Sequence, residues 1–91
     1  MPIYCKNQED SFERRRSVRP THLQRLEELR GQNRLFLVGP LLNIEIKGSL
    51  IVAEFANLSA AKEWAAADPY VTANVYSRVI VYPFKKLCHN Y

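Results

Sequence analysis

Residues 34–55, RLFLVGPLLNIEIKGSLIVAEF, decide the fold, because they contain two apolar runs joined by a short connection. The first run, residues 34–40, stays apolar until Gly39-Pro40 ends it, which is typical of a strand buried on both faces. Residues 50–55 repeat this pattern. The connection is short enough for an antiparallel hairpin, with the second strand starting as early as Ile44.

A strand and a helix are predicted before this hairpin. Residues 2–6 form a short strand, and the polar residues 7–16 have no apolar periodicity, which predicts a mobile or functional loop. Residues 20–30 form a helix with Pro20 at its first position and Gly31 as its stop. Three leucines at spacing three form its core stripe: Leu23, Leu26 and Leu29.

A second helix and a last strand are predicted after the hairpin. Asn57 caps a helix that ends near Ala67, and its alanine-rich sequence favours helix throughout. Asp68-Pro69 is an N-cap followed by proline at the first helical position, which opens a short helical turn through Ala73. Residues 77–84 have an alternating pattern that predicts the last strand.

The resulting order, β-α-β-β-α-β, predicts an α+β, ferredoxin-like antiparallel sheet with both helices on one side. Each hairpin strand is apolar on both faces. In the first strand we expect Leu35 and Leu37 on one face and Phe36 and Val38 on the other. In the second strand we expect Leu50 and Val52 on one face and Ile51, Ala53 and Phe55 on the other. A monomer would expose an apolar sheet face of several hundred Å², at or above what soluble monomers usually show. We therefore expect two sheets to pack face to face in a homodimer.

Length and composition limit the function classes. The chain has 91 residues, with 47% hydrophobic and 24% charged, so residues 1–91 form one folded domain and a two-domain enzyme is excluded. The net charge of +4 is compatible with nucleic acid and with an anionic small molecule. Cys5 and Cys88 are expected as free thiols in a cytoplasmic protein, since no secretory leader and no membrane-spanning run occurs.

His22 and Asp68 are the candidates for acid–base chemistry. His22 is expected in the first turn of its helix, beside the leucine stripe, where a histidine can act as a base or simply bond a backbone carbonyl. Asp68 lies in an apolar context and has a ready structural role as an N-cap. A capping aspartate can also orient a histidine, so only the distance between the two separates these interpretations.

Other chemistry finds less support. Arg14, Arg15, Arg16 and Arg19 can grip a planar anion or form a solvated surface. The aromatic pattern of RNA-binding ferredoxin-like sheets is absent, which makes nucleic acid a minority interpretation. No short metal-ligand spacing and no nucleophile motif occurs, so neither a metal site nor covalent catalysis is expected.

Four segments resemble the YciI-like (YCII-related) family over nearly the whole chain. They are SVRPTHL at residues 17–23, NRLFLVGP at residues 33–40, AAADPYV at residues 65–71 and VYPFKK at residues 81–86. The resemblance implies a ferredoxin-like fold, dimers of the dimeric α+β barrel type, and an active site made by His22 and Asp68. It makes Ser17, Arg19 and Tyr70 candidates for substrate binding, with Arg15 or Arg16 reaching an anion. The hairpin connection is shorter than in many members, and Asn74 replaces a common glycine.

The sequence thus predicts a small-molecule enzyme that uses a His22–Asp68 dyad for general acid–base chemistry without a cofactor. Proton abstraction beside a carbonyl or elimination from a hydroxylated ring suits such a dyad. Similarity to the family suggests lyase, isomerase or dehydrochlorinase chemistry on an unknown substrate. The alternative is a non-catalytic metabolite-binding or interaction module, since one fold hosts unrelated functions.

Overall fold

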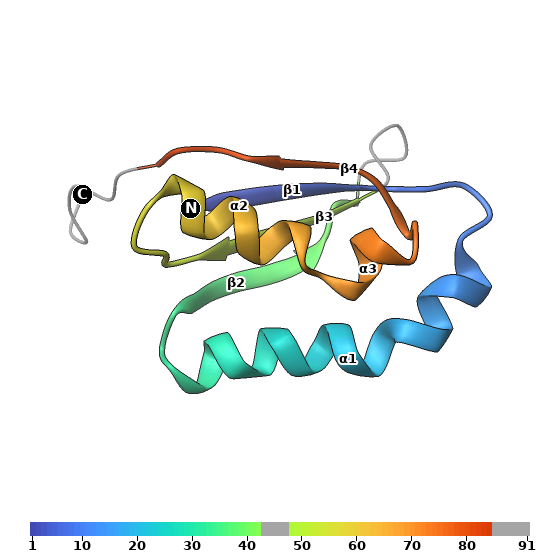
Figure 1. The fold of residues 1–91 in the computed structure, drawn as a ribbon, viewed down its shortest axis with the longest axis horizontal. Helices are drawn as coiled ribbons and strands as arrows, with labels where there is room; N and C mark the ends of the chain where they lie inside the picture. The colour runs from blue at the N-terminus through green and yellow to red at the C-terminus, as the bar shows by residue number, and fades with distance from the viewer. Residues whose placement is uncertain (43–47, 85–91) are drawn as a thin grey trace.

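The computed structural model describes residues 1–42 and 48–84 of the chain and shows one four-stranded sheet covered by helices on one face (Figure 1). The elements in chain order are β1 (Pro2–Asn7), α1 (Phe12–Gly31), β2 (Leu35–Pro40), β3 (Gly48–Ala53), α2 (Leu58–Ala66), α3 (Pro69–Thr72) and β4 (Tyr76–Val81). The strand order is β2-β3-β1-β4, and every neighbouring pair is antiparallel. This confirms the α+β, ferredoxin-like fold.

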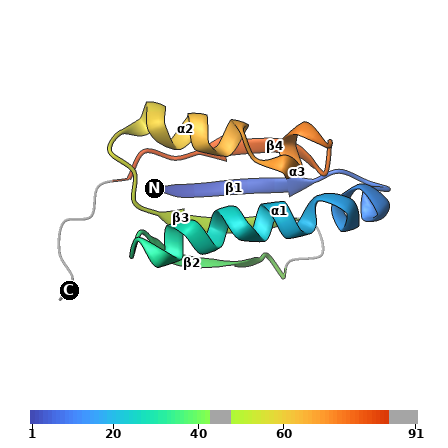
Figure 2. The ribbon, with the colours of Figure 1, turned by 60° about the horizontal axis from the view of Figure 1, so that its bottom comes forward.

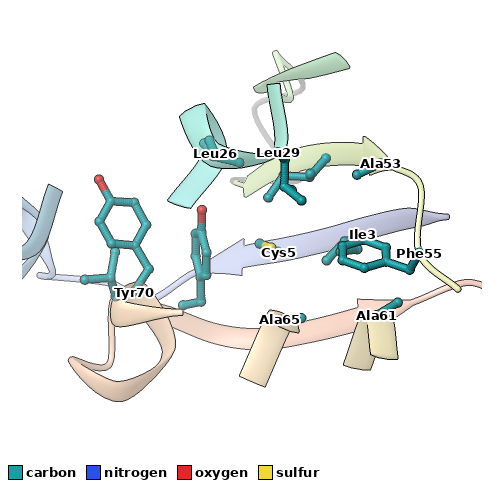
Figure 3. Close-up of a cluster of buried hydrophobic side chains, with 12 residues drawn as sticks. Ile3, Cys5, Leu26, Leu29, Ala53, Phe55, Ala61, Ala65 and Tyr70 are labelled. Atoms are coloured by element: carbon teal, nitrogen blue, oxygen red, sulfur yellow. The ribbon is translucent and has the colours of Figure 1, made fainter. Parts of the chain in front are cut away.

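The helices and the sheet enclose the hydrophobic core. Figure 2 shows α1 beside α2 and α3 on the same side of the sheet. Alternate residues of β1, Ile3 and Cys5, point into the core, where Leu26 from α1 and Ala61 from α2 cover them (Figure 3).

The helix α1 begins eight residues earlier than the sequence predicted. The expected loop over residues 7–16 ends at Ser11, and Pro20 lies inside the helix rather than at its start. Two arginines hold the early turns: Arg15 donates to the Asn7 side chain at 2.8 Å, and Arg14 donates to the Asn74 carbonyl at 3.2 Å. These turns are anchored by polar contacts, so hydrophobic periodicity could not reveal them.

The extra turns change the position of His22, which lies in the middle of α1 instead of its first turn. The first turns run at an angle to the rest of the helix in Figure 1, as expected when proline removes a helical hydrogen bond. The predicted leucine stripe is also rotated. His22, Leu26 and Leu29 share the buried face, and Leu23 is 43% exposed.

An irregularity in β2 changes which residues share a face. The register with β3 shifts between Leu35 and Leu37, so that Leu35 pairs with Ala53 but Leu37 pairs with Val52. Paired residues lie on the same face of an antiparallel sheet. Leu35 therefore faces the helices and Leu37 faces away from them, and the expectation that both share a face is wrong. The possible start of β3 at Ile44 lies outside the described residues.

The helix caps of the second half agree with the sequence. The Asn57 side chain accepts the Ala60 N–H at 2.8 Å at the start of α2, and Asp68 caps α3 with Pro69 as its first residue. Asn74 follows α3 with φ of 58°, a left-handed conformation that asparagine tolerates and that glycine adopts without strain. β4 then begins at Tyr76 and ends at Val81, so it is shorter than expected.

Gly48 allows the backbones of β1 and β3 to meet closely. It pairs with Lys6 in the sheet, and a Cβ atom at this position would collide with the backbone carbonyl of Cys5. Glycine is therefore required where β3 enters the sheet.

Candidate active site

The structure brings His22 and Asp68 together. His22 Nδ1 lies 2.8 Å from Asp68 Oδ1, and the two residues are only 6% and 3% exposed. The expected proximity is confirmed. A carboxylate only accepts hydrogen bonds, so the neutral imidazole carries its hydrogen on Nδ1 and donates it to Asp68. This assignment leaves Nε2 with a lone pair, which is the atom that can accept a proton.

Asp68 has three donors around its carboxylate. Oδ1 accepts the Tyr70 N–H at 2.9 Å in addition to the His22 bond, and Oδ2 accepts from Arg25 Nη1 at 2.9 Å. The capping role and the histidine-orienting role therefore coexist in one side chain, as the sequence allowed. Both carboxylate oxygens are occupied, which fixes the orientation of the carboxylate.

Arg25 is a residue of this cluster that the sequence did not single out. It is three residues after His22 on α1, and its second arm donates from Nη2 to the Trp64 carbonyl at 2.6 Å. Its guanidinium also lies 4.4 Å from the centroid of the Trp64 ring, a cation–π contact. The helical spacing from His22 was the available signal, because residues three apart share a helix face.

Two tyrosines pack against the imidazole. The Tyr70 ring is stacked on His22 with centroids 3.8 Å apart and planes 7° apart. Tyr76 meets both rings edge-on, with its centroid 6.2 Å from that of His22. Tyr70, which was expected to bind substrate, is 3% exposed and covers one face of the imidazole. No motif indicated Tyr76, which is also buried.

Burial keeps the nearby acidic groups neutral. It raises the pKa of the Cys5 thiol to about 12, and the negative charge of Asp68 adds to this effect. Burial also raises the pKa of the Tyr76 phenol, with the charges of Cys5 and Asp68 acting in the same direction. At neutral pH both groups are uncharged, so Asp68 supplies the negative charge of the cluster. Cys5 is a free thiol as expected, and Cys88 lies outside the described residues.

Comparison with known proteins identifies the family. The YCII-related domain matches residues 1–85. The chain belongs to the YCII-related family. It is 46% identical over 93 residues to the protein YciI of Escherichia coli O6:H1, covering 93% of this chain and 95% of that protein. An uncharacterized protein of Haemophilus influenzae is 45% identical with the same coverage.

A solved structure shares the fold of this YCII-related chain. It is 5-chloro-2-hydroxyhydroquinone dehydrochlorinase (TftG) from Burkholderia phenoliruptrix AC1100, in complex with 2,5-dihydroxybenzoquinone. The TM-score is 0.79 and the sequences are 25% identical, with 98% of this chain and 96% of that chain covered. The YCII-related fold thus occurs in a protein that is named for small-molecule chemistry.

The remaining predicted site residues of this YCII-related chain lie on the outer flank of α1. Ser17, Arg16 and Arg19 are exposed. Arg16 and Arg19 line a hollow of about 600 Å³ together with Phe12, Arg15, Pro20 and Leu23. Arg15 also lies against Tyr70, with its guanidinium 5.1 Å from the ring centroid, and Tyr70 in turn stacks on His22. Ser17 does not line this hollow.

Residues 1–42 and 48–84 contain no cluster of three histidine, cysteine, aspartate or glutamate side chains placed to hold a metal ion. No helix in this part of the chain has the length and apolar character needed to cross a membrane.

Proposed function

We propose that this protein is a small-molecule enzyme in which His22 is the general acid or base. The buried bond from His22 Nδ1 to Asp68 Oδ1 at 2.8 Å carries this proposal, because it leaves Nε2 as the proton-accepting atom. Asp68 fixes the tautomer and stabilises the imidazolium that forms when Nε2 takes a proton. Such a pair contributes roughly 10²–10⁴-fold to the rate of proton transfer.

The reaction class that fits this base is proton abstraction beside a carbonyl, or elimination from a hydroxylated ring. In a dehydrochlorination, the base takes one proton and one chloride ion leaves, so the loss of HCl balances without a redox step. The shared fold with a dehydrochlorinase that binds a dihydroxybenzoquinone supports this class.

We further propose that the ligand is anionic and that Arg16 and Arg19 contact it. Guanidinium groups bind carboxylates and phosphates through two parallel hydrogen bonds. Both arginines line the 600 Å³ hollow, where Phe12 and Leu23 offer apolar contacts to the body of a ligand. Arg16→Gln and Arg19→Gln should each weaken binding of an anionic ligand, and exchange of the distant exposed Arg78 should not.

The homodimer expected from the sequence also remains a proposal, supported by the face of the sheet that the helices leave open. Tyr4, Leu50 and Ile80 form one row across β1, β3 and β4, and Val52 pairs with Leu37 beside it. A second copy of this face would cover these apolar side chains. Ile80→Lys should give the mass of one chain in light scattering, whereas Gln24→Lys on exposed α1 should not change the mass. A wild-type mass of one chain would contradict the dimer.

The enzyme proposal is tested by turnover. The first probe is 5-chloro-2-hydroxyhydroquinone, with chloride release as the readout, followed by other halogenated hydroquinones and small hydroxylated carbonyl compounds. His22→Gln and Asp68→Asn should lower kcat at least ~100-fold. Asn57→Asp, which keeps a cap on α2 away from the dyad, is the matched control. Full activity of His22→Gln on any substrate would end the proposal.

A non-catalytic binding module is the second candidate. Asp68 already has structural roles, because it caps α3 and pairs with Arg25, and these need no catalysis. A ligand that raises the melting temperature and is recovered chemically unchanged after long incubation would favour this function.

A further inference from the structure

Arg25 joins three elements of the site through one side chain. One arm donates to Asp68 at the start of α3, the other donates to Trp64 at the end of α2, and the residue itself belongs to α1. The Arg25 side chain is 18% exposed, so these bonds are largely shielded from water.

The fork of the guanidinium is needed for this arrangement. The Asp68 N–H donates to the Ala65 carbonyl, which leaves the Trp64 carbonyl at the helix end for Arg25. A planar guanidinium can donate to both acceptors while it lies against the Trp64 ring, and an ammonium group has no plane to place there. A cation at the C-terminal end of α2 is also favoured by the helix dipole.

We propose that Arg25 is a positioning residue that holds the Asp68 carboxylate in the orientation required by His22. The Tyr70 N–H holds Oδ1 and Arg25 holds Oδ2, so the two bonds together keep the carboxylate from turning and keep Oδ1 aligned with His22 Nδ1. Arg25 thereby selects the histidine tautomer that leaves Nε2 free. A contribution of Arg25 to catalysis rests on the proposed function, whereas its positioning of Asp68 is a property of the protein without substrate.

The tautomer of His22 provides a direct test. Long-range proton–nitrogen correlation spectra of the ¹⁵N-labelled full chain, recorded at alkaline pH, distinguish hydrogen on Nδ1 from hydrogen on Nε2. His22→Gln assigns the signals. Arg25→Gln and Arg25→Lys are compared with Arg30→Gln, a matched control on the same helix whose arginine pairs with Glu27 at the surface.

We expect the ratio of the Nδ1–H to the Nε2–H tautomer to fall about tenfold in Arg25→Gln, because a carboxylate released at Oδ2 can turn and weaken its charge-assisted bond with His22 Nδ1. Arg25→Lys should lower the ratio by about threefold, because it keeps the charge and loses the fork. Arg30→Gln should leave the ratio unchanged. If Arg25→Gln fails to fold, Arg25→Lys decides alone, and an unchanged ratio in either folded variant overturns the proposal.

Measuring the tautomer ratio needs no substrate, so it tests the positioning role of Arg25 separately from the enzyme proposal. A shifted tautomer ratio with no turnover on any substrate would refute the enzyme and leave the positioning role intact. Turnover that depends on His22, together with an unchanged ratio in the Arg25 variants, would refute the positioning role alone. With a substrate in hand, Arg25→Lys should recover part of the kcat that Arg25→Gln loses.

Discussion

Replacing Asp68 by alanine should lower the free energy of unfolding by about 3–7 kcal/mol. The substitution removes the cap of α3, worth about 1 kcal/mol. It also leaves the buried His22 Nδ1–H without its acceptor, and Arg25 without its carboxylate, at a cost of about 1–3 kcal/mol for each group. Asp68→Asn keeps an oxygen for the Tyr70 N–H, so we expect a smaller loss of about 2 kcal/mol.

Urea denaturation followed by circular dichroism measures these losses at one fixed protein concentration. Asn57→Ala is the matched control, because Asn57 caps α2 by the same kind of bond and is exposed. It should cost about 1 kcal/mol. The difference in unfolding free energy between the Asp68→Ala and Asn57→Ala variants then gives the stability that the contacts of Asp68 with His22 and Arg25 contribute beyond the helix cap. If Asp68→Ala costs no more than Asn57→Ala, the contacts of Asp68 with His22 and Arg25 do not stabilise the fold and the reasoning is refuted.

Three further predictions concern the frame of the site. The unfolded chain releases the Cys5 proton near pH 9.0 and the folded protein holds it to about pH 12, so stability should fall with rising pH between these values. Cys5 contributes up to about 1.4 kcal/mol per pH unit to this slope, and the buried Tyr76 phenol adds its own contribution above about pH 10. Cys5→Ala should therefore lower the slope in urea titrations, most clearly between pH 9 and 10; equal slopes would contradict the buried thiol. Gly48→Ala should lower the melting temperature strongly, whereas Gly39→Ala, where the added methyl meets open space, should not. Asn74→Gly should be neutral or stabilising and Asn74→Ala should cost about 1 kcal/mol, measured by thermal unfolding; equal stability of the two would exclude the left-handed conformation.

Local signals predicted the second half of the fold better than the first. Asn57 and the Asp68-Pro69 pair are capping signals that depend only on neighbouring residues, and the structure has both caps where they were expected. The start of α1 depends on contacts between distant residues. Arg14 and Arg15 hold its first turns through Asn74 and Asn7, and such polar contacts leave no hydrophobic period in the sequence.

The candidate site was predicted as a pair and is a larger cluster in the structure. His22 and Asp68 were identified by their sequence context and by the family resemblance, and their contact is present. Arg25 escaped notice because an arginine in a polar helix usually points to water. Its burial depends on the end of α2, which the sequence of α1 does not encode. The stacking of the Tyr70 ring on His22 was not predicted, and the role of Tyr70 in substrate binding stays a prediction.

The hydrogen bond between His22 and Asp68 spans 46 residues and connects the two halves of the chain. The first half supplies α1 and the second supplies α3, while β1 lies between β3 and β4 of the second half. Neither half alone contains both partners. Because α1 is built from local contacts and the dyad joins distant residues, we expect the dyad to form after α1 during folding. A chain cut between β2 and β3 would therefore regain the His22 Nδ1 hydrogen bond only when its two fragments reassemble.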